Sequence, residues 1–315
     1  MSDWQSLLPQ PDQLGESPFW HPGEQMLYWV DIPARQIRRM DVDVGAAESW
    51  AMPMEPGCIA PARSGGLVIA LRDGIYRARR WGGPLDLIER FGHDVATTRF
   101  NDGKADPLGR LWAGTMYEPR DAQKAALYSI DCRPANGRGG VPLVERKAGD
   151  ATIANGLAWS PDSKTVYWAD TPAHVIRAWD WASESNAMRR PRVFHQFAQK
   201  PAGWQAGQAE QNGQADYGGR PDGAAVDSAG NYWCAMFEGG CLLNLSPAGE
   251  VLERLALPVR CPTMPCFGGP DLKTLFVTSA SHHRPAEELK AMPQSGHVLW
   301  RRTGVAGLPV NFFSD

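Results

Sequence analysis

The sequence predicts an all-β fold, a six-bladed β-propeller, from three observations. A short turn-and-strand unit recurs six times along the 315 residues. Equivalent positions upstream of these units are separated by 42, 43, 54, 67 and 42 residues, and one four-stranded propeller blade takes about 40–45 residues. Gly and Pro number 33 and 26, which suits many tight turns and few long helices. Only residues 287–292 favour a helical turn.

Each unit joins a polar turn to a strand in which Val, Ile, Trp and Tyr are frequent, and these residues favour β-strands. In chain order the units contain residues 26–32, 67–71, 110–115, 165–169, 231–235 and 274–279. A second strand-like run follows each unit after Gly or polar residues, as a β-hairpin requires. These runs are 36–40, 74–78, 126–130, 175–179, 240–245 and 297–301.

A ring of blades has to be closed, because closure removes exposed sheet edges. We expect the N-terminal segment 4–8 to pair in the last blade. Residues 1–315 are expected to form a single propeller domain with an inserted loop at about 196–219, which is rich in Gln, Gly and Ala. The loop is typical of a tolerated surface insertion, or of a lid that brings Trp204 or Tyr217 to a substrate.

Composition and charge exclude several classes of function. The net charge of −3 argues against a nucleic-acid partner. No stretch approaches the ~18 apolar residues that a membrane helix needs, and the N-terminus lacks a signal-peptide pattern. These features predict a cytoplasmic protein. The six cysteines include no CxxC pair, so a structural zinc site is not expected.

One position upstream of each unit stands either eleven or thirteen residues before the strand centre. Counting back eleven residues from Ile69, Trp112 and Trp233 gives Cys58, Asn101 and Asp222. Counting back thirteen from Trp29, Trp168 and Val277 gives Glu16, Asn155 and Met264. We assign the two-residue difference to the length of the turn. Equivalent positions of a circular repeat meet around one axis, and four of these six residues carry a side-chain oxygen.

The four oxygen donors, Glu16, Asn101, Asn155 and Asp222, predict a site for a hard divalent cation. Ca²⁺ is the first expectation, followed by Mg²⁺ and Mn²⁺, while Zn²⁺ or Fe²⁺ could occupy such a site depending on availability. Met264 and Cys58 hold the two remaining positions, and we expect them to wall the pocket. Each residue taken singly also fits an ordinary role, because Asn-Gly and Asp-Gly are common turn signals. The shared register is what favours a site.

Register also separates Asn101 from its neighbour Asp102. Asn101 precedes Asp106 by five residues, as Asp222 precedes Asp227. A slip of one residue would turn the wrong side chain to the axis, so we assign Asp102 a structural role in bracing the turn. Arg99 stands two residues before Asn101 and would share its face of an extended strand.

Several motifs together resemble the regucalcin/gluconolactonase family of sugar lactonases, also called senescence marker proteins. They are Leu-Gly-Glu-Ser-Pro-Phe-Trp at 14–20, Arg-Phe-Asn-Asp-Gly-Lys-Ala-Asp-Pro-Leu-Gly-Arg at 99–110, Ala-Gly-Thr-Met at 113–116, Ala-Asn-Gly-Leu-Ala-Trp-Ser at 154–160, Pro-Asp-Gly at 221–223 and Cys-Phe-Gly-Gly at 266–269. The resemblance covers nearly the whole chain and departs from the family at 196–219.

This resemblance implies a propeller with one divalent metal at its centre. Glu16, Asn155 and Asp222 would be the metal ligands, and Asp222 would also be the catalytic acid and base. Arg99 and Asn101 would bind the substrate. The family has a substrate-binding Glu just after the Ala-Gly-Thr-Met motif, and Glu118 stands one residue early for that role.

The implied activity is metal-dependent hydrolysis of an aldonolactone, such as gluconolactone, to the open-chain sugar acid. Two alternatives stay open at this point. One is a calcium-binding propeller without catalytic activity. The other is a related hydrolase of lipophilic lactones or phosphotriesters, for which an apolar mouth would be built by Met264, Cys58, Trp204 and Phe19.

Overall fold

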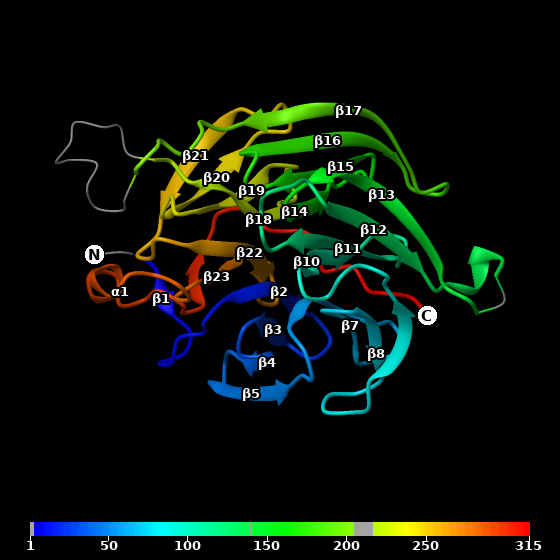
Figure 1. The fold of residues 1–315 in the computed structure, drawn as a ribbon. Coiled ribbons are helices and arrows are strands. Elements are labelled where there is room, and N and C mark those ends of the chain that lie inside the picture. Colours follow the sequence, from blue (N-terminus) through cyan, green and yellow to red (C-terminus); the bar gives the residue numbers. More distant parts are fainter. Residues whose placement is uncertain (1–2, 139, 205–216) are drawn as a thin grey trace.

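Six antiparallel sheets of four strands each, arranged around a common centre, account for the strands of the described residues (Figure 1). The structure is a computed structural model, and it describes residues 3–138, 140–204 and 217–315. The first strands of neighbouring sheets contact one another and form the inner ring. The prediction of a six-bladed β-propeller is therefore confirmed.

Five blades run in chain order from the inner to the outer strand. The first two are β2 (Gly15–His21), β3 (Met26–Asp31), β4 (Gln36–Asp41) and β5 (Ala46–Ala51), then β6 (Pro56–Pro61), β7 (Leu67–Leu71), β8 (Gly74–Ala78) and β9 (Asp86–Arg90). The third and fourth are β10 (Thr98–Ala105), β11 (Leu111–Tyr117), β12 (Ala125–Asp131) and β13 (Leu143–Ala151), then β14 (Ala154–Trp159), β15 (Thr165–Asp170), β16 (Val175–Ala182) and β17 (Ala187–Gln196). The fifth is β18 (Arg220–Val226), β19 (Tyr232–Phe237), β20 (Cys241–Leu245) and β21 (Val251–Ala256).

The sixth blade joins the two ends of the chain. It contains β22 (Pro262–Gly268), β23 (Thr274–Ser279) and β24 (Leu299–Arg302), with β1 (Gln5–Ser6) as its outer strand. The expected pairing of the N-terminal segment in the last blade is confirmed by this arrangement. Trp4 is buried beside β1, and its indole N–H donates to the carbonyl of Ala256 at 2.9 Å.

Helix is scarce in the described residues. The α-helix α1 (Ala286–Ala291) falls close to the expected turn at 287–292, and a 3₁₀ turn, η1, covers Pro134–Asn136. No helix of the described part of the chain combines the length and apolar character that crossing a membrane demands. Residues 205–216 of the expected insertion lie outside the described residues, and the prediction of one domain over 1–315 stays a prediction.

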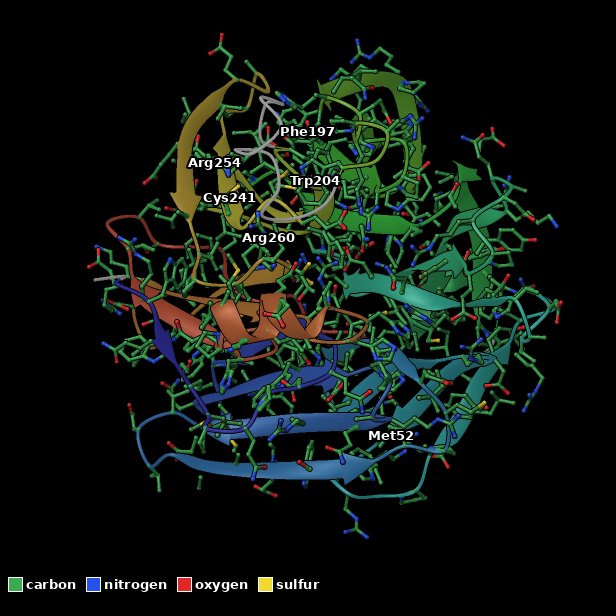
Figure 2. All side chains as sticks on the ribbon, turned by 60° about the vertical axis from the view of Figure 1, so that its left-hand side comes forward. Met52, Phe197, Trp204, Cys241, Arg254 and Arg260 are labelled. Atoms are coloured by element: carbon green, nitrogen blue, oxygen red, sulfur yellow. The ribbon has the colours of Figure 1, made fainter. Side chains whose placement is uncertain are left out.

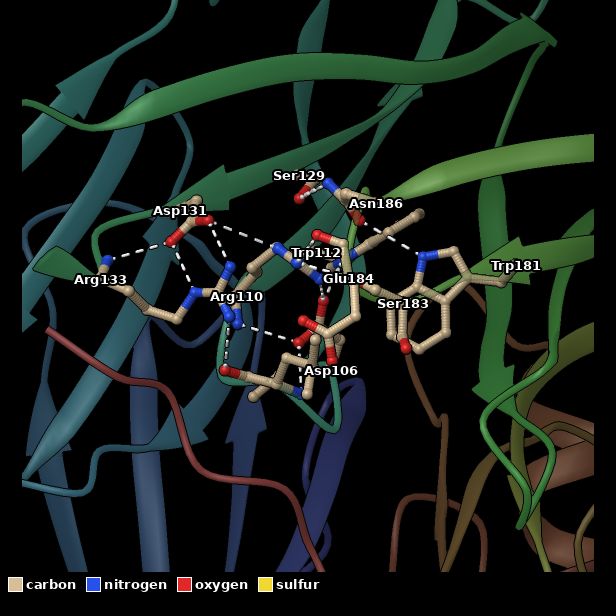
Figure 3. Close-up of polar contacts among 12 residues, drawn as sticks. Asp106, Arg110, Trp112, Ser129, Asp131, Arg133, Trp181, Ser183, Glu184 and Asn186 are labelled. Atoms are coloured by element: carbon tan, nitrogen blue, oxygen red, sulfur yellow. Dashed lines mark hydrogen bonds and ion pairs between the residues drawn. The ribbon is translucent and has the colours of Figure 1, made fainter. Parts of the chain in front are cut away.

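A buried aspartate fixes the hairpin turn in two of the blades. Asp106 accepts hydrogen bonds from the backbone N–H of Arg110 at 3.0 Å and from the indole N–H of Trp112 at 2.9 Å (Figure 3). Asp227 accepts the corresponding bonds from the backbone of Asn231 and the indole of Trp233, both at 2.9 Å. Because both carboxylates are fully buried, these turns set the register of the strands around them.

The core lies between neighbouring sheets, so that the blades pack face to face. At the junction of the third and fourth blades, Trp112 meets Trp159 and Trp181 edge to face, with ring centroids 5.6 and 6.1 Å apart. Arg110 crosses the same junction and donates to the carbonyl of Ser183 at 2.8 Å (Figure 3). These contacts leave the inner strands free to carry polar side chains at the axis.

Candidate active site

Every inner strand that carries a candidate ligand contains a β-bulge at that point. The bulges lie between Glu16 and Phe19, between Phe100 and Gly103, between Asn155 and Ala158, and between Pro221 and Ala224. Glu16 and Asn155 are therefore the last paired residues before their bulges, whereas Asn101 and Asp222 lie inside theirs. Assigning the spacing difference to the turn alone was wrong, because the position relative to the bulge also differs. Bulges redirect side chains. Here they allow the residues before a bulge and the residues inside a bulge to face the same axis.

The glycines that follow the ligands belong to these bulges rather than to hairpin turns. Gly156 has a φ of 61°, and a Cβ there would lie 2.3 Å from the hydroxyl of Tyr232. A Cβ on Gly223 would lie 2.5 Å from the Cβ of Met264. Gly156 of the Asn-Gly pair is needed because its backbone is left-handed. Gly223 of the Asp-Gly pair is needed because the next blade packs closely against it.

The four oxygen donors line one cavity of about 260 Å³ at the inner ring. Its lining residues are Leu14, Glu16, Arg99, Asn101, Met116, Arg120, Ile153, Asn155, Thr171, Arg220, Asp222, Phe237, Ala280, His282, His283 and Arg284. Glu16, Asn101, Asn155 and Asp222 are all buried. Residues far apart in the sequence, from the first, third, fourth and fifth blades, therefore line one cavity that is open to the outside.

A second layer of the cavity comes from the residues two positions before the donors. Leu14 precedes Glu16, Arg99 precedes Asn101, Ile153 precedes Asn155 and Arg220 precedes Asp222, and all four line the cavity. Strand side chains two residues apart point to the same side, which accounts for this layer. It has two apolar members and two arginines, so the cavity is not electrically uniform.

A chain of hydrogen bonds orients the amides of the site. Arg99 donates from Nη1 to Oδ1 of Asn101 at 2.8 Å, and Asn101 donates from Nδ2 to Oδ1 of Asn155 at 2.9 Å. Asn155 then donates from Nδ2 to the hydroxyl of Thr171 at 2.8 Å. The amide oxygen of Asn155 accepts one hydrogen bond and keeps a second lone pair with which it could act as a ligand.

The two carboxylates of the cavity oppose each other electrostatically. Burial raises the pKa of Glu16 well above its ordinary value, and the charges of Asp222 and Asp102 raise it further. Burial also raises the pKa of Asp222 to about 8. Holding two buried carboxylates in one cavity costs free energy unless a positive charge compensates them.

Asp102 contacts the neighbouring blade, whereas its own turn, which it was expected to brace, is held by Asp106. The Oδ2 of Asp102 accepts a hydrogen bond from the backbone N–H of Leu157 at 2.8 Å, and so ties β10 to the bulge of β14. Its Oδ1 is buried and has no hydrogen-bond partner in the described residues. Asp102 does not belong to the cavity lining.

The donor set fits a hard divalent cation. Glu16 and Asp222 supply two carboxylates, Asn155 supplies an amide oxygen, and neither thiol nor thioether sulfur is needed. Within the described residues, no three side chains of the His, Cys, Asp and Glu types gather into a metal-binding cluster. An amide oxygen would therefore have to complete the set, as the sequence predicted.

Residues 14–281 match the family model described as the SMP-30/Gluconolactonase/LRE-like region. The chain belongs to this family. It is 41% identical over 308 residues to the 6-deoxy-6-sulfogluconolactonase of Pseudomonas putida, covering 98% of this chain and 97% of that protein. It is 34% identical to the pentonolactonase XacC of Haloferax volcanii, covering 85% and 82%.

A solved structure agrees with the fold of this SMP-30/gluconolactonase-like chain. It is the calcium-binding protein regucalcin of Agrobacterium tumefaciens, with a TM-score of 0.84 and 25% identity over 98% of this chain and 96% of that one. The resemblance inferred from the sequence motifs is thus confirmed at the level of the family.

Met264 and Cys58 do not wall the cavity of this family member, so that expectation was wrong. Cys58 is fully buried, and the Cβ that Gly103 lacks would lie 2.5 Å from its sulfur. Met264 lines a separate cavity of about 320 Å³ together with Phe19 and Lys104. Both side chains lie beyond the bulges of their strands, which turns them away from the site.

Glu118 lies outside the cavity lining. Its carboxylate receives two hydrogen bonds from Arg72, at 3.0 and 3.1 Å, and lies 3.5 Å from Nε of Arg99. Its expected contact with substrate stays a prediction. In the structure, Glu118 forms an ion pair with the guanidinium of Arg99 and so helps to position it.

The two aromatic residues of the expected lid pack against each other outside the cavity. Trp204 and Tyr217 have ring centroids 5.1 Å apart, and Lys200 lies over the Trp204 ring at 4.9 Å. Phe197 packs against the core cluster that contains Cys241, and Figure 2 shows it with Trp204 beside that blade. Neither lid candidate belongs to the cavity lining, and the rest of the expected lid falls on residues outside the described ones.

Sequence reasoning missed six polar residues of the cavity: Arg120, Thr171, Arg220, His282, His283 and Arg284. A signal was available for Arg220, because Arg-Pro-Asp at 220–222 repeats the spacing of Arg-Phe-Asn at 99–101. The others come from loops at the ends of strands, where no periodic pattern marks them.

Proposed function

We propose that this protein is a metal-dependent lactonase that hydrolyses a small, gluconolactone-like sugar lactone to the open-chain sugar acid. One observation carries the proposal: Glu16, Arg99, Asn155 and Asp222, from four different blades, line the same cavity of about 260 Å³. The names of two relatives, a 6-deoxy-6-sulfogluconolactonase and a pentonolactonase, support sugar lactones as the substrate class.

Glu16, Asn155 and Asp222 would hold one divalent cation, with Ca²⁺ as the first expectation and Zn²⁺, Mn²⁺, Mg²⁺ and Fe²⁺ as alternatives. When bound, such a cation polarises a carbonyl and stabilises negative charge that develops on its oxygen. Burial, and after it the charge of Asp222, raises the pKa of Glu16, and a dication beside the two carboxylates would offset both effects.

Asp222 would be the general base and then the general acid. Its carboxylate would take a proton from the attacking water, and would return that proton to the ring oxygen as the carbon–oxygen bond of the lactone breaks. Arg99 would orient the sugar hydroxyl groups. Both ends of the Asn101 amide are already hydrogen-bonded within the chain, so we assign Asn101 a positioning role as well as the expected contact with substrate.

A lactone panel followed with a pH indicator tests this function. Protein stripped of metal with a chelator should release no acid above background from gluconolactone, xylonolactone or galactonolactone, and added Ca²⁺ or Mn²⁺ should restore turnover. Asp222→Ala should abolish activity while circular dichroism stays unchanged, because one acid/base group supplies about 10²–10⁴-fold in rate. Turnover above about a tenth of wild type would rule out this role for Asp222.

A calcium-binding protein without catalytic activity is the second candidate. The observation in its favour is that the solved relative with a TM-score of 0.84 is named a calcium-binding protein. Arg99 argues for the enzyme, since its buried guanidinium lines the cavity and a metal buffer has no need of it. Ca²⁺ binding without acid release from any lactone of the panel would select this candidate.

The alternative of a lipophilic substrate loses its structural basis. It relied on an apolar mouth made of Met264, Cys58, Trp204 and Phe19, and none of these described residues lines the cavity.

A further inference from the structure

Three arginines that the lactonase mechanism does not use also line the cavity: Arg120, Arg220 and Arg284. Arg220 and Arg284 share one carboxylate partner, Glu238. Glu238 lies 3.5 Å from Nη2 of Arg220, 3.4 Å from Nη1 of Arg284 and 2.9 Å from the ammonium of Lys200. A single carboxylate thus faces three cations at this end of the cavity.

Arg284 is well satisfied by another partner. Its guanidinium makes two hydrogen bonds to Glu288 of α1, at 2.7 and 2.6 Å. Arg220 has no such second carboxylate among the described residues. Its guanidinium carbon lies 5.2 Å from the centre of the Phe237 ring, and its Nε is buried without a hydrogen-bond partner in the described part of the chain. The guanidinium of Arg220 is therefore held in place and still has N–H groups that could donate hydrogen bonds to a ligand.

Arg120 has no carboxylate within 4 Å among the described residues, although it lines the cavity. It stands in the turn after β11 with a φ of 61°. Burial lowers the pKa of Arg120, and the charge of Arg220 lowers it further. Two guanidinium groups that face one cavity and repel each other are costly unless an anion lies between them.

The arginines could simply balance the carboxylates of Glu16 and Asp222. A bound dication removes that role, because it neutralises these two carboxylates itself. We propose that Arg120 and Arg220 together bind an oxyanionic group carried by the lactone substrate, such as a sulfonate, a phosphate or a second carboxylate. Guanidinium forks recognise these groups through paired hydrogen bonds. This inference rests on the proposed lactonase function and narrows its substrate class.

The test compares lactones that differ in one substituent. Neutral glucono-lactone is compared with its 6-phosphate, its 6-sulfonate and the 6-carboxylate, and the three anions distinguish the possible sources of the oxyanion. We expect kcat/KM to be at least about tenfold higher for one anionic lactone than for the neutral one. Arg120→Gln should lower kcat/KM for that anionic lactone by about 10–100-fold, as loss of a charged hydrogen bond predicts, and should change the neutral lactone less than about threefold.

Two further variants sharpen the comparison. Arg120→Lys keeps the charge without the fork, so it should recover part of the loss. Arg189→Gln removes an exposed arginine of the outer strand β17 and should leave both substrates unchanged. Equal kcat/KM for neutral and anionic lactones, or an equal loss for both in Arg120→Gln, would overturn the proposal.

A binding measurement separates this inference from the lactonase function. Titration calorimetry with 6-phosphogluconate, 6-sulfogluconate, glucarate and gluconate reports affinity without turnover. The anion site is supported if a substituted acid binds more tightly than gluconate, and if this difference is lost in Arg120→Gln and weakened by salt. This result would stand even if no lactone is hydrolysed. Equal affinity for all four acids contradicts it, even if lactones are hydrolysed.

Discussion

Asn101 donates a hydrogen bond to Oδ1 of Asn155 across the junction of the third and fourth blades, at 2.9 Å. The same nitrogen donates to the carbonyl of Ala154 at 3.0 Å. Asn155 passes the chain on to Thr171, whose hydroxyl donates to the carbonyl of Pro221 at 2.7 Å. Pro221 adjoins Asp222, so these bonds link two of the proposed metal ligands through residues outside the donor set.

Replacing Asn101 by Ala should therefore weaken metal binding without removing a proposed ligand. The amide of Asn155 would lose the donor that fixes its oxygen, and loss of such an outer partner typically costs 10–100-fold in metal affinity. Titration calorimetry with Ca²⁺ measures this change. Asn311→Ala serves as the control, because Asn311 donates to the Ala105 carbonyl and lines the other cavity. An unchanged Kd in Asn101→Ala would show that the chain of bonds does not orient the ligand.

Trp4 should matter for stability well beyond its place at the N-terminus. It is 5% exposed, packs in the core cluster between the fifth and sixth blades, and stands beside the strand that closes the ring. Trp4→Ala should lower the free energy of unfolding by about 3–5 kcal/mol, as for other buried tryptophans. Urea unfolding measures the loss, with Leu252→Ala on the exposed outer strand as the control. A loss below about 1 kcal/mol would show that ring closure does not depend on this segment.

Substitution of a buried turn aspartate should also lower the free energy of unfolding. Asp106→Ala would leave two backbone N–H groups and the indole of Trp112 without their acceptor. Because buried donors left unpaired cost about 1–3 kcal/mol each, we expect unfolding to become easier by at least about 3 kcal/mol. Asp162→Ala removes an exposed turn aspartate and should cost less than about 1 kcal/mol. Similar losses for the two variants would refute the role assigned to Asp106.

The same turns explain why the fold could be predicted from the sequence. Asp106 and Asp227 act within their own hairpins, so their spacing to the strand centres is a local pattern that a single sequence displays. Equal spacing from Asn101 and Asp222 to these aspartates placed both residues at the cavity. The closing of the ring by the N-terminal segment followed from the need to cover a sheet edge.

The parts that could not be predicted depend on contacts between blades. Asn155–Gly156 matches the sequence of a hairpin turn, and only the approach of Tyr232 shows why glycine is needed in a bulge there. Glu118 is drawn to Arg72 and Arg99, a pairing that no local pattern marks. Met264 has the spacing of a site residue, but its position beyond the bulge of β22 turns it to another cavity.

Stability should depend on pH through Asp12. This carboxylate accepts hydrogen bonds from the Trp29 indole at 2.8 Å and from Arg38, yet burial raises its pKa to about 6 from 3.8. A folded-state pKa above the unfolded value favours the folded state at low pH, and this contribution is lost as pH rises through about 6.

The difference in unfolding free energy between wild type and Asp12→Asn isolates that contribution, since the other groups titrate alike in both proteins. We expect wild type to lose about 2 kcal/mol relative to the variant between pH 4.5 and 7.5, from 1.36 kcal/mol per pKa unit. Denaturant unfolding at several pH values measures it. A difference that is constant or rises with pH would mean that pairing with Arg38 outweighs burial.

Metal stoichiometry tests the central claim most directly. Protein stripped of metal, then titrated with Ca²⁺, Mn²⁺ and Zn²⁺ by calorimetry and checked by elemental analysis, should bind one equivalent of dication per chain. Glu16→Gln and Asp222→Asn should each weaken that binding by at least about 100-fold while near-ultraviolet circular dichroism stays that of the wild type. Wild-type stoichiometry and affinity in both variants, or no binding of any of these cations by the wild type, would contradict the proposed site.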